Sequence, residues 1–437
     1  MIILILLITF FLRVFLLIKN KWVGNDTFAY ATYALEFKKK GHMIKIPDQM
    51  KPPYNDFVPQ LFTAFLSLFP KKSYRYLQYL SPLLDLIIII LLYNFSLTFF
   101  GETAALIASF AYAITPIAVY SCFALGPRTF SNLFLTLAML SLFFYFNGSS
   151  IFLLLFFISS AIILLSHRLT TQSLVTLTLA GSIAFSNVIP ILALVAAAIF
   201  WLVTLRGTYV KILKTHYEKL SNYAKRGSYR DGKIKFESPI RLFSSFPFIL
   251  FLIGYLIIFG SFNQLFLEVW FFSILALSFL WVLGDGFRYL DNAIFPGSIL
   301  IGISVLKVPF PELVFFVFAL ISFGGVLKLI QTYQASHNAI KPGFIECCKF
   351  VRKNSKRSDV LVPFPWDYHY VYVSIFFADV NTIGGHVDYN EKGVSTTGKV
   401  DEYKVTWVIT NNPSPFAKSR LYSQKFESKG FFVFKRK

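Results

Sequence analysis

The sequence predicts a polytopic α-helical membrane protein that carries a small C-terminal α/β domain. Of its 437 residues, 56% are apolar and only 15% are charged. Apolar runs of roughly 17 to 25 residues, the length that crosses a bilayer, recur through the first three quarters of the chain. In the last quarter the hydropathy falls, and short strand-like and helix-like segments alternate. Together these observations predict the fold class before any motif is considered.

The apolar runs divide into about eleven transmembrane helices. Residues 1–20 contain neither a basic amino-terminal region nor a small-residue cleavage site, so they are predicted to be a retained helix and not a signal peptide. Residues 56–70 are too short to cross and are expected at the membrane interface. The remaining spans are predicted at about residues 74–98, 102–122, 130–147, 149–166, 171–187, 189–206, 242–260, 264–283, 293–309 and 311–331.

With this number of spans, the long polar segments all fall on one side of the membrane, and the other side receives only tight turns. A transporter normally works at both faces, so the asymmetry favours a protein that acts at one face. Residues 207–241 are predicted to be a flexible basic loop on that side. The polar segments are residues 21–73, 123–129, 167–170, 207–241, 284–292 and the C-terminal tail.

The formal net charge of +20 gives two opposite indications of orientation. Most of the Lys and Arg residues lie on the polar side, which the positive-inside rule assigns to the cytoplasm. The same residues attract anionic lipid head groups, by about 1 kcal/mol each, and they would attract a substrate that carries a lipid phosphate. Membrane lipids are therefore expected partners, and nucleic acid is not.

Residues 1–337 are predicted to form the transmembrane domain, and residues 338–437 a soluble α/β domain. In the second segment, a helix is expected over 343–354 and another from about residue 367. Strand-like pieces lie at 359–364, 379–385, 405–410 and 431–437 and suggest a mostly parallel sheet. The three cysteines (Cys122, Cys347 and Cys348) form neither a disulfide framework nor a metal-ligand spacing.

The first polar stretch, residues 22–41, reads WVGNDTFAYATYALEFKKKG. Its apolar spacing predicts an interfacial amphipathic helix over 26–37. Asn25 or Asp26 would cap that helix, and the lysines at 38–40 would complement its dipole. Helix capping alone therefore accounts for Asp26, and a catalytic role is the alternative.

The order of motifs after the first span resembles the start of the GT-C membrane glycosyltransferases, especially the lipid A aminoarabinose transferases and protein O-mannosyltransferases. An acid follows the first helix at Asp26, and a Lys-Pro-Pro segment begins at Lys51. Later loops place Arg128 in ALGPRTFS, His167 and Arg168 in SHRLTT, and Arg288 and Tyr289 in GDGFRYLDNAIFP. The last of these is similar to the Arg-Tyr-Leu-x-x-x-x-x-Pro signature of the family.

The resemblance implies the GT-C fold and transfer of a sugar from a polyprenyl-phosphate donor with inversion at the anomeric carbon. Asp26 would be the general base. The residues expected on the donor-phosphate side are Lys51, Arg128, His167, Arg168, Arg288 and Tyr289. The family often has an Asp-Glu pair where this chain has Asp26 and Thr27, so metal dependence is open: no cofactor is certain, and a divalent cation (Mg²⁺ or Mn²⁺) is the alternative.

Several residues are candidates for the acceptor side. Trp366, Asp367 and Tyr368 are similar to part of the Trp-Trp-Asp-Tyr-Gly motif of oligosaccharyltransferases, although they equally suit packing of the small domain. His386 lies in a GGHVDY stretch that also suits a tight turn. Asp56 is a second carboxylate near Asp26 in sequence, or the cap of a short helix.

The family resemblance places the active face and the C-terminal domain outside the cytoplasm, against the positive-inside count. The acceptor would be a lipid, a glycan or a protein. Three alternatives stay open at this point: transfer of a whole oligosaccharide to protein, a lipid or polysaccharide transporter, and a non-catalytic scaffold that keeps the fold.

Overall fold

The computed structural model describes residues 1–20, 22–41, 49–51, 61–227, 237–280, 286–335, 340–364, 368–383, 404–417 and 419–437. The chain divides into two compact units. The first comprises residues 1–19, 59–62 and 79–332, and the second comprises 20–58, 63–78 and 333–437.

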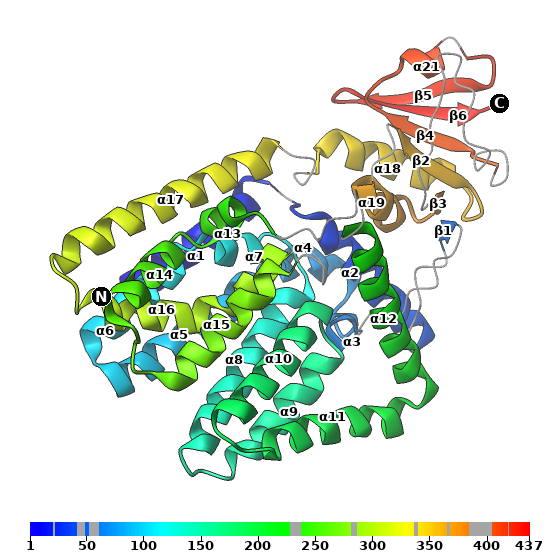
Figure 1. Ribbon diagram of the computed structural model, residues 1–437. Coiled ribbons are helices and arrows are strands. Elements are labelled where there is room, and N and C mark those ends of the chain that lie inside the picture. The colour runs from blue at the N-terminus through cyan, green and yellow to red at the C-terminus, as the bar shows by residue number, and fades with distance from the viewer. Residues whose placement is uncertain are drawn as a thin grey trace. The chain divides into compact units, whose positions relative to one another are not determined.

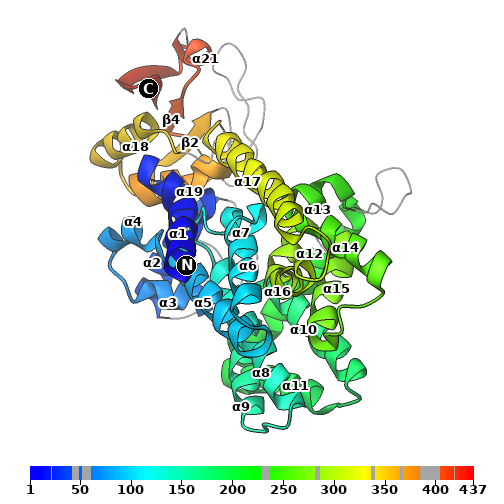
Figure 2. The same cartoon turned by 90° about the vertical axis from the view of Figure 1, so that its left-hand side faces the viewer.

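The first unit is helical, and every apolar run predicted as a span contains helix. Its elements are α1 (Ile2–Lys19), α5 (Leu80–Phe100), α6 (Glu102–Ala113), α7 (Pro116–Ser121), α8 (Pro127–Phe146), α9 (Phe152–Leu164), α10 (Arg168–Ala184), α11 (Ile189–Leu205), α12 (Gly207–Gly227), α13 (Pro239–Ser245), α14 (Phe248–Phe259), α15 (Leu265–Phe279), the 3₁₀ helix η3 (Gly286–Asn292), α16 (Ile294–Val305) and α17 (Pro311–Ala335). Helices α8, α9 and α10 lie side by side (Figure 1), and α14 and α15 both pack on α16 (Figure 2).

Among the described residues, four helices (α1, α5, α8 and α17) are long and apolar enough to cross a bilayer. A fifth span arises if α13 and α14, which meet at a bend of 106°, count as one. Helices α9, α11, α15 and α16 are apolar but shorter. The chain is therefore a membrane protein, and the number of eleven spans stays a prediction.

Two predicted spans are broken where proline falls inside them. Helix α6 ends at Ala113 and α7 begins at Pro116, and α13 ends before Pro247. Proline has no N–H for the helical ladder and its ring clashes with the preceding turn, so a continuous helix cannot run through either position. A further difference concerns residues 207–227, predicted as part of a loop, which form α12 with Tyr209 and Ile212 buried along one face.

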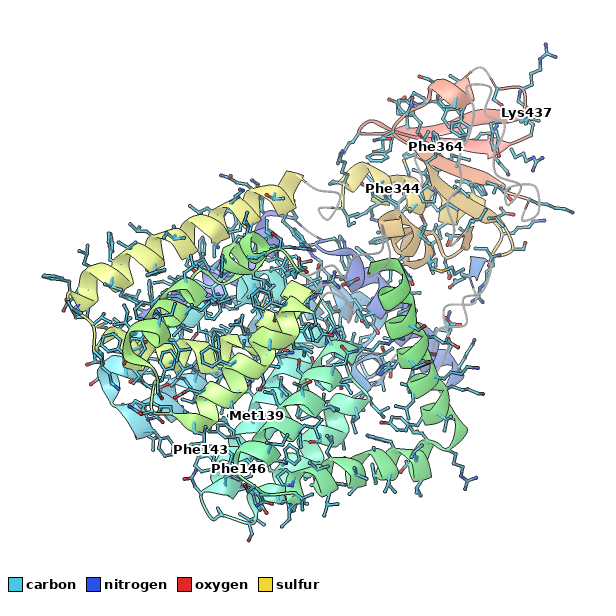
Figure 3. The ribbon with its side chains drawn as sticks, viewed as in Figure 1. Met139, Phe143, Phe146, Phe344, Phe364 and Lys437 are labelled. Atoms are coloured by element: carbon cyan, nitrogen blue, oxygen red, sulfur yellow. The ribbon has the colours of Figure 1, made fainter. Side chains whose placement is uncertain are left out.

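Aromatic and small residues fill the interior of this unit. Phe143 and Phe146, labelled with Met139 in Figure 3, extend from α8. Phe146 stacks on Phe185 with ring centroids 4.4 Å apart. A side chain at Gly302 of α16 would collide with the carbonyl of Ala104, so glycine permits the close approach of α16 to α6.

A buried ion pair joins α1, α5 and α6. Arg13 Nε donates to Asp85 Oδ2 at 2.7 Å, and the Tyr112 hydroxyl donates to Asp85 Oδ1 at 2.8 Å. The same guanidinium also donates to the carbonyls of Ala113 and Tyr112. An acid inside a predicted span thus has a cationic partner on a neighbouring helix, as buried charge in a membrane requires.

The second unit combines the first polar stretch of the chain with its C-terminal part. Its elements are α2 (Asn25–Lys40), β1 (Met50–Lys51), the 3₁₀ helix η1 (Lys71–Ser73), α4 (Tyr74–Leu77), α18 (Pro342–Asn354), β2 (Val360–Phe364), α19 (Tyr368–Ala378), β3 (Asn381–Ile383), β4 (Trp407–Thr410), α21 (Ser414–Ala417), β5 (Tyr422–Ser428) and β6 (Phe431–Arg436). The boundary between the units falls within α3 (Leu61–Ser67) and α17.

The strands form one mixed sheet in the order β1-β3-β2-β4-β6-β5. Strands β1, β3, β2 and β4 run parallel, whereas β6 is antiparallel to both β4 and β5. Figure 1 shows β5, β6, β4 and β2 side by side, with α21 beside β5. Val360, Val362 and Phe364 of β2 point into a buried core with Phe416 of α21. Phe344 of α18 and Phe364 of β2 mark two parts of this unit in Figure 3.

The predicted helices and strands of the C-terminal segment are present, but the sheet has two strands beyond those predicted. Strand β5 alternates exposed and partly buried residues over YSQKFES. Strand β1 comes from the N-terminal polar stretch, where Met50 pairs with Thr382 and Lys51 with Ile383. Residues 20–58 and 63–78 thus group with residues 333–437, although the sequence boundary was expected near residue 337 alone.

Candidate functional site

Five of the six residues predicted on the donor-phosphate side lie in the first unit, and four of them are basic. We call Arg128, His167, Arg168 and Arg288 the basic cluster. Arg128 lies in the first turn of α8, His167 caps α10, Arg168 is the first residue of α10, and Arg288 lies in η3. Two of these side chains thus stand at helix N-termini next to His167, where the dipoles also favour an anion.

The three arginines of the basic cluster all affect the pKa of the His167 imidazole. Burial lowers the pKa of His167, and the charges of Arg128, Arg288 and Arg168 lower it further, to about 3. Its Nδ1 lies 2.9 Å from the hydroxyl of Thr170. His216 of α12 is also affected by the cluster: burial and the charge of Arg168 lower its pKa to about 4. Both rings are therefore neutral at physiological pH, and the positive charge of the cluster resides on its arginines.

A buried carboxylate, Asp291, lies beside the cluster. Its Oδ2 accepts hydrogen bonds from Ser121 Oγ and from Asn132 Nδ2, each at 2.7 Å. Arg128 Nη1 lies 3.5 Å from the same Ser121 hydroxyl. Burial raises the pKa of Asp291 to about 6, against the opposing effect of Arg128 and the two hydrogen bonds.

The η3 segment that carries Arg288 and Tyr289 is held firmly against α10 and α15. The Tyr289 hydroxyl donates to Gln172 Oε1, and Asn292 Nδ2 donates to Ser173 Oγ at 2.7 Å. Trp270 Nε1 donates to the carbonyl of Asn292 at 3.0 Å. Tyr289 itself is buried, so its hydroxyl serves this network in the structure.

A cavity of about 350 Å³ lies one residue away from the basic cluster, because its lining includes Tyr120, whose ring lies near Arg128, and Phe287, which precedes Arg288. The guanidinium of Arg128 lies 5.3 Å from the ring of Tyr120, which contacts Phe287, and Arg241 lies 3.7 Å from the Phe287 ring on the cavity side. The lining combines two cations and several hydroxyls with apolar surface. These residues are Pro116, Ile117, Tyr120, Arg241, Ser244, Ser245, Phe287, Gly325, Lys328, Leu329 and Thr332.

Asp26 belongs to the second unit, in the first turn of α2, and its side chain is exposed. The expected cap differs from the observed one, because Gly24 occupies the N-cap with a positive φ of 78° and Asp26 lies inside the helix. Helix α2 packs on α19, and the hydroxyls of Tyr33 and Tyr372 lie 2.6 Å apart. Asp26 thus presents a carboxylate on a firmly packed helix.

Lys51 lies in β1, at the edge of the sheet of the second unit. Tyr368 begins α19. The side chains of both lie outside the described part of the structure. The other acceptor-side candidates, Asp56, Trp366, Asp367 and His386, also lie outside the described residues. Their roles stay predictions.

Within the described ranges, no group of three or more His, Cys, Asp or Glu side chains is arranged to hold a metal ion. The three cysteines are buried free thiols.

Sequence reasoning missed Ser121, Asn132, Arg241 and Asp291. Two of them carried a signal: Asp291 follows Arg288 by three residues, and Asn132 follows Arg128 by four, which places it on the same helix face. Arg241 and Ser121 carried no sequence signal, because α13 and α7 come next to η3 only in the folded protein.

No protein-family model and no curated protein sequence matches the chain. Solved structures match its fold. One is the oligosaccharyltransferase of Archaeoglobus fulgidus tethered with an acceptor peptide that contains the NVT sequon: the TM-score is 0.61 at 12% identity, covering 93% of this chain and 68% of that one. The same enzyme in complex with Zn and sulfate gives 0.59 at 12% identity, covering 99% and 72%.

A further match is ArnT from Cupriavidus metallidurans bound to undecaprenyl phosphate, with a TM-score of 0.61 at 11% identity, covering 99% of this chain and 97% of that one. Both proteins are of the GT-C superfamily. The chain therefore has the GT-C fold predicted from its motifs. A fold shared at this level of identity hosts more than one activity, so the activity is argued from the site.

Proposed function

We propose that the chain is an integral membrane glycosyltransferase of the GT-C type that uses a polyprenyl-phosphate-linked sugar. The observation that carries the proposal is the basic cluster, which concentrates three guanidinium groups around one neutral imidazole within a GT-C fold. Guanidinium groups at that position suit a substrate with a phosphate group, because their planar donors match its oxygens.

The adjoining cavity supports a lipid-linked donor. Its walls offer Lys328 and Arg241 to an anion, although Arg241 also pairs with Glu237 at 3.4 Å, and they offer Ile117 and Leu329 to an apolar chain. A prenyl phosphate has both parts. ArnT, which shares the fold, has been solved with undecaprenyl phosphate bound.

In the proposed reaction, a hydroxyl of the acceptor attacks the anomeric carbon of the donor sugar. The new C–O bond forms on the face opposite the phosphate, so the configuration inverts while the bond to the phosphate oxygen breaks. Asp26 takes the proton of the hydroxyl as general base. The bonding pair leaves with the polyprenyl phosphate, and Lys51, Arg128, Arg168 and Arg288 stabilise the added negative charge, with His167 and Tyr289 at the same side.

The acceptor is a lipid, a glycan or a protein in this proposal. Transfer of a whole glycan to protein is the second candidate, which the fold match to an oligosaccharyltransferase favours together with the Trp366-Asp367-Tyr368 sequence. Trp366, Asp367, Tyr368, His386 and Asp56 are then the proposed acceptor-side residues.

The experiment measures release of free polyprenyl phosphate by the purified protein in lipid, with a panel of polyprenyl-phosphate sugars. We expect Asp26→Asn to lower turnover by about 10²- to 10⁴-fold, the usual contribution of a general base. Glu312→Gln is the matched control, because Glu312 is also an exposed acid in the first turn of a helix. Equal turnover in wild type and Asp26→Asn, at matched thermal stability, would contradict the role of Asp26.

We further propose that the active face and residues 338–437 lie outside the cytoplasm of the cell membrane. A membrane-impermeant amine reagent should then label lysines of residues 207–241 and of the C-terminal tail on intact cells. Labelling only after lysis would contradict this orientation.

A further inference from the structure

Asp291 is a buried acid in η3, three positions after Arg288. The proposed reaction gives it no role, either as the base or as a phosphate ligand. It is 8% exposed. Its Oδ2 receives hydrogen bonds from two helices, from Ser121 at the end of α7 and from Asn132 of α8. A buried carboxylate with specific partners next to a cationic site is a candidate for a functional role.

The hydrogen bonds run in one direction, from Arg128 to Asp291. Arg128 Nη1 lies 3.5 Å from Ser121 Oγ as donor, and the Ser121 hydroxyl donates to Asp291 Oδ2 at 2.7 Å. The carbonyl of Ile117 lies 3.0 Å from the same hydroxyl as a competing acceptor. An ionised Asp291 draws the Ser121 proton toward itself and leaves the Ser121 lone pairs facing Arg128.

A second connection passes through α8. Arg128 and Asn132 stand four residues apart and so share a helix face, and Asn132 Nδ2 donates to Asp291 at 2.7 Å. Thr129 Oγ1 also donates to the carbonyl of Ser121 at 3.2 Å, which ties the start of α8 to the end of α7. Asp291 is therefore linked to the position of Arg128 from two sides.

We propose that Asp291 is a positioning residue: its carboxylate, through Ser121 and Asn132, holds the Arg128 guanidinium where the phosphate of the substrate binds. The proposal rests on the proposed function of the basic cluster. It assigns Asp291 no contact with substrate. Its charge also partly offsets that of Arg128.

A double-mutant cycle separates positioning from a general structural role. Asp291→Asn, Arg128→Gln and the double variant are compared by polyprenyl phosphate release in lipid. We expect Asp291→Asn to lower kcat about tenfold when Arg128 is present and less than about twofold in the Arg128→Gln background, a coupling typical of residues in one network. Equal losses in both backgrounds would overturn the proposal, because a structural effect does not depend on Arg128.

The pH profile gives a second readout. Wild-type turnover should fall as the pH drops through about 6, where Asp291 takes up a proton, and the remaining activity of Asp291→Asn should lack that fall. His167 and His216 titrate at lower pH. Protonation of the proposed base Asp26 affects wild type and Asp291→Asn alike, so the readout is the difference between the two profiles. An unchanged acid limb in Asp291→Asn would contradict the proposal. The other charged or titratable groups that act on Asp291 are Arg128 of α8, Asp85 of α5, Tyr112 of α6 and Cys122 after α7.

Two controls keep the test decisive. If Asp291→Asn does not fold, Ser121→Ala removes the link to Arg128 and leaves Asp291 with Asn132, and it should reproduce most of the loss. If wild type releases no polyprenyl phosphate from any donor, the proposed function has failed. The same cycle is then measured on the affinity for farnesyl phosphate: a loss of about tenfold that depends on Arg128 supports positioning, and an equal loss without Arg128 overturns it.

Discussion

Two regions of the first unit contain buried or half-buried charge, and their charged groups are arranged differently. Between α1, α5 and α6, one guanidinium, Arg13, pairs with one carboxylate, Asp85. Arg13 also donates to backbone carbonyls, and Asp85 also accepts from the Tyr112 hydroxyl. At the start of α8 and α10, the charges of three guanidinium groups act on His167, and Asp291 lies beside one of them, Arg128.

The difference indicates what each region is for. A buried pair that is complete holds helices together, since removal of either partner leaves an uncompensated charge. In the basic cluster, three guanidinium groups act on one neutral imidazole, and a bound anion would be attracted by all three. The balanced pair is therefore structural, and the basic cluster is the candidate for substrate binding.

The largest expected effect comes from breaking the balanced pair. Asp85→Ala leaves Arg13 buried without its carboxylate, and we expect it to lower the free energy of unfolding by about 3–5 kcal/mol. Thermal unfolding of purified protein measures it. Arg13→Met combined with Asp85→Leu should recover much of the loss, and failure to recover any would show that the pair is not an isolated unit.

A smaller effect is the contribution of His167 in the basic cluster to the pH dependence of folding stability. The pKa of His167 is about 3 in the folded protein against 6.5 ordinarily, so between these values the unfolded chain binds a proton that the folded chain does not. Stability should therefore fall on acidification through this window, by on the order of 1 kcal/mol per pH unit. Asp291, with its raised pKa of about 6, acts in the opposite direction below that pH.

The difference between wild type and His167→Gln isolates the contribution of His167, because Asp291 and His216 are present in both. Thermal midpoints at pH 7.5 and pH 4.5 provide the measurement (pH values chosen to bracket most of the window, about 3 to 6.5). We expect the variant to lose less stability on acidification. An identical loss would mean that His167 is not shielded from protons in the folded state.

The smallest effect concerns the support of the cluster. Ser173→Ala removes the acceptor of the Asn292 hydrogen bond that ties η3 to α10. We expect it to lower the free energy of unfolding by about 1 kcal/mol, as for a single buried hydrogen bond. A loss as large as that of Asp85→Ala would show that η3 depends on this bond far more than its surroundings indicate.

Most of the helical unit could be predicted from the sequence, because long apolar runs have few alternatives in a membrane. The breaks at Pro116 and Pro247 carried a readable signal. The helical character of residues 207–227 was missed since their net polarity concealed the buried face of Tyr209 and Ile212.

The basic cluster was predictable as a set of residues at loop ends, but its companions were not. Asp291 and Ser121 are separated by 170 residues and meet only through the packing of α7 on η3. The sequence showed Asp26 as an acid after the first span. It did not show that Gly24 is the N-cap of α2 and that Asp26 lies inside the first turn. Strand β1 was the hardest element to predict, because a strand of two residues is too short to show the alternation of apolar and polar side chains that marks a strand.

That short strand has a consequence for biosynthesis. Met50 and Lys51 leave the ribosome early, whereas Thr382 and Ile383, their partners in the sheet, are translated only after all the helices of the first unit. The β1 edge of the sheet thus forms late, by the pairing of two segments that lie far apart in the chain. A ribosome that stalls before residue 381 would release a protein with its helices made and its β1 segment still waiting for a partner, a substrate for quality control.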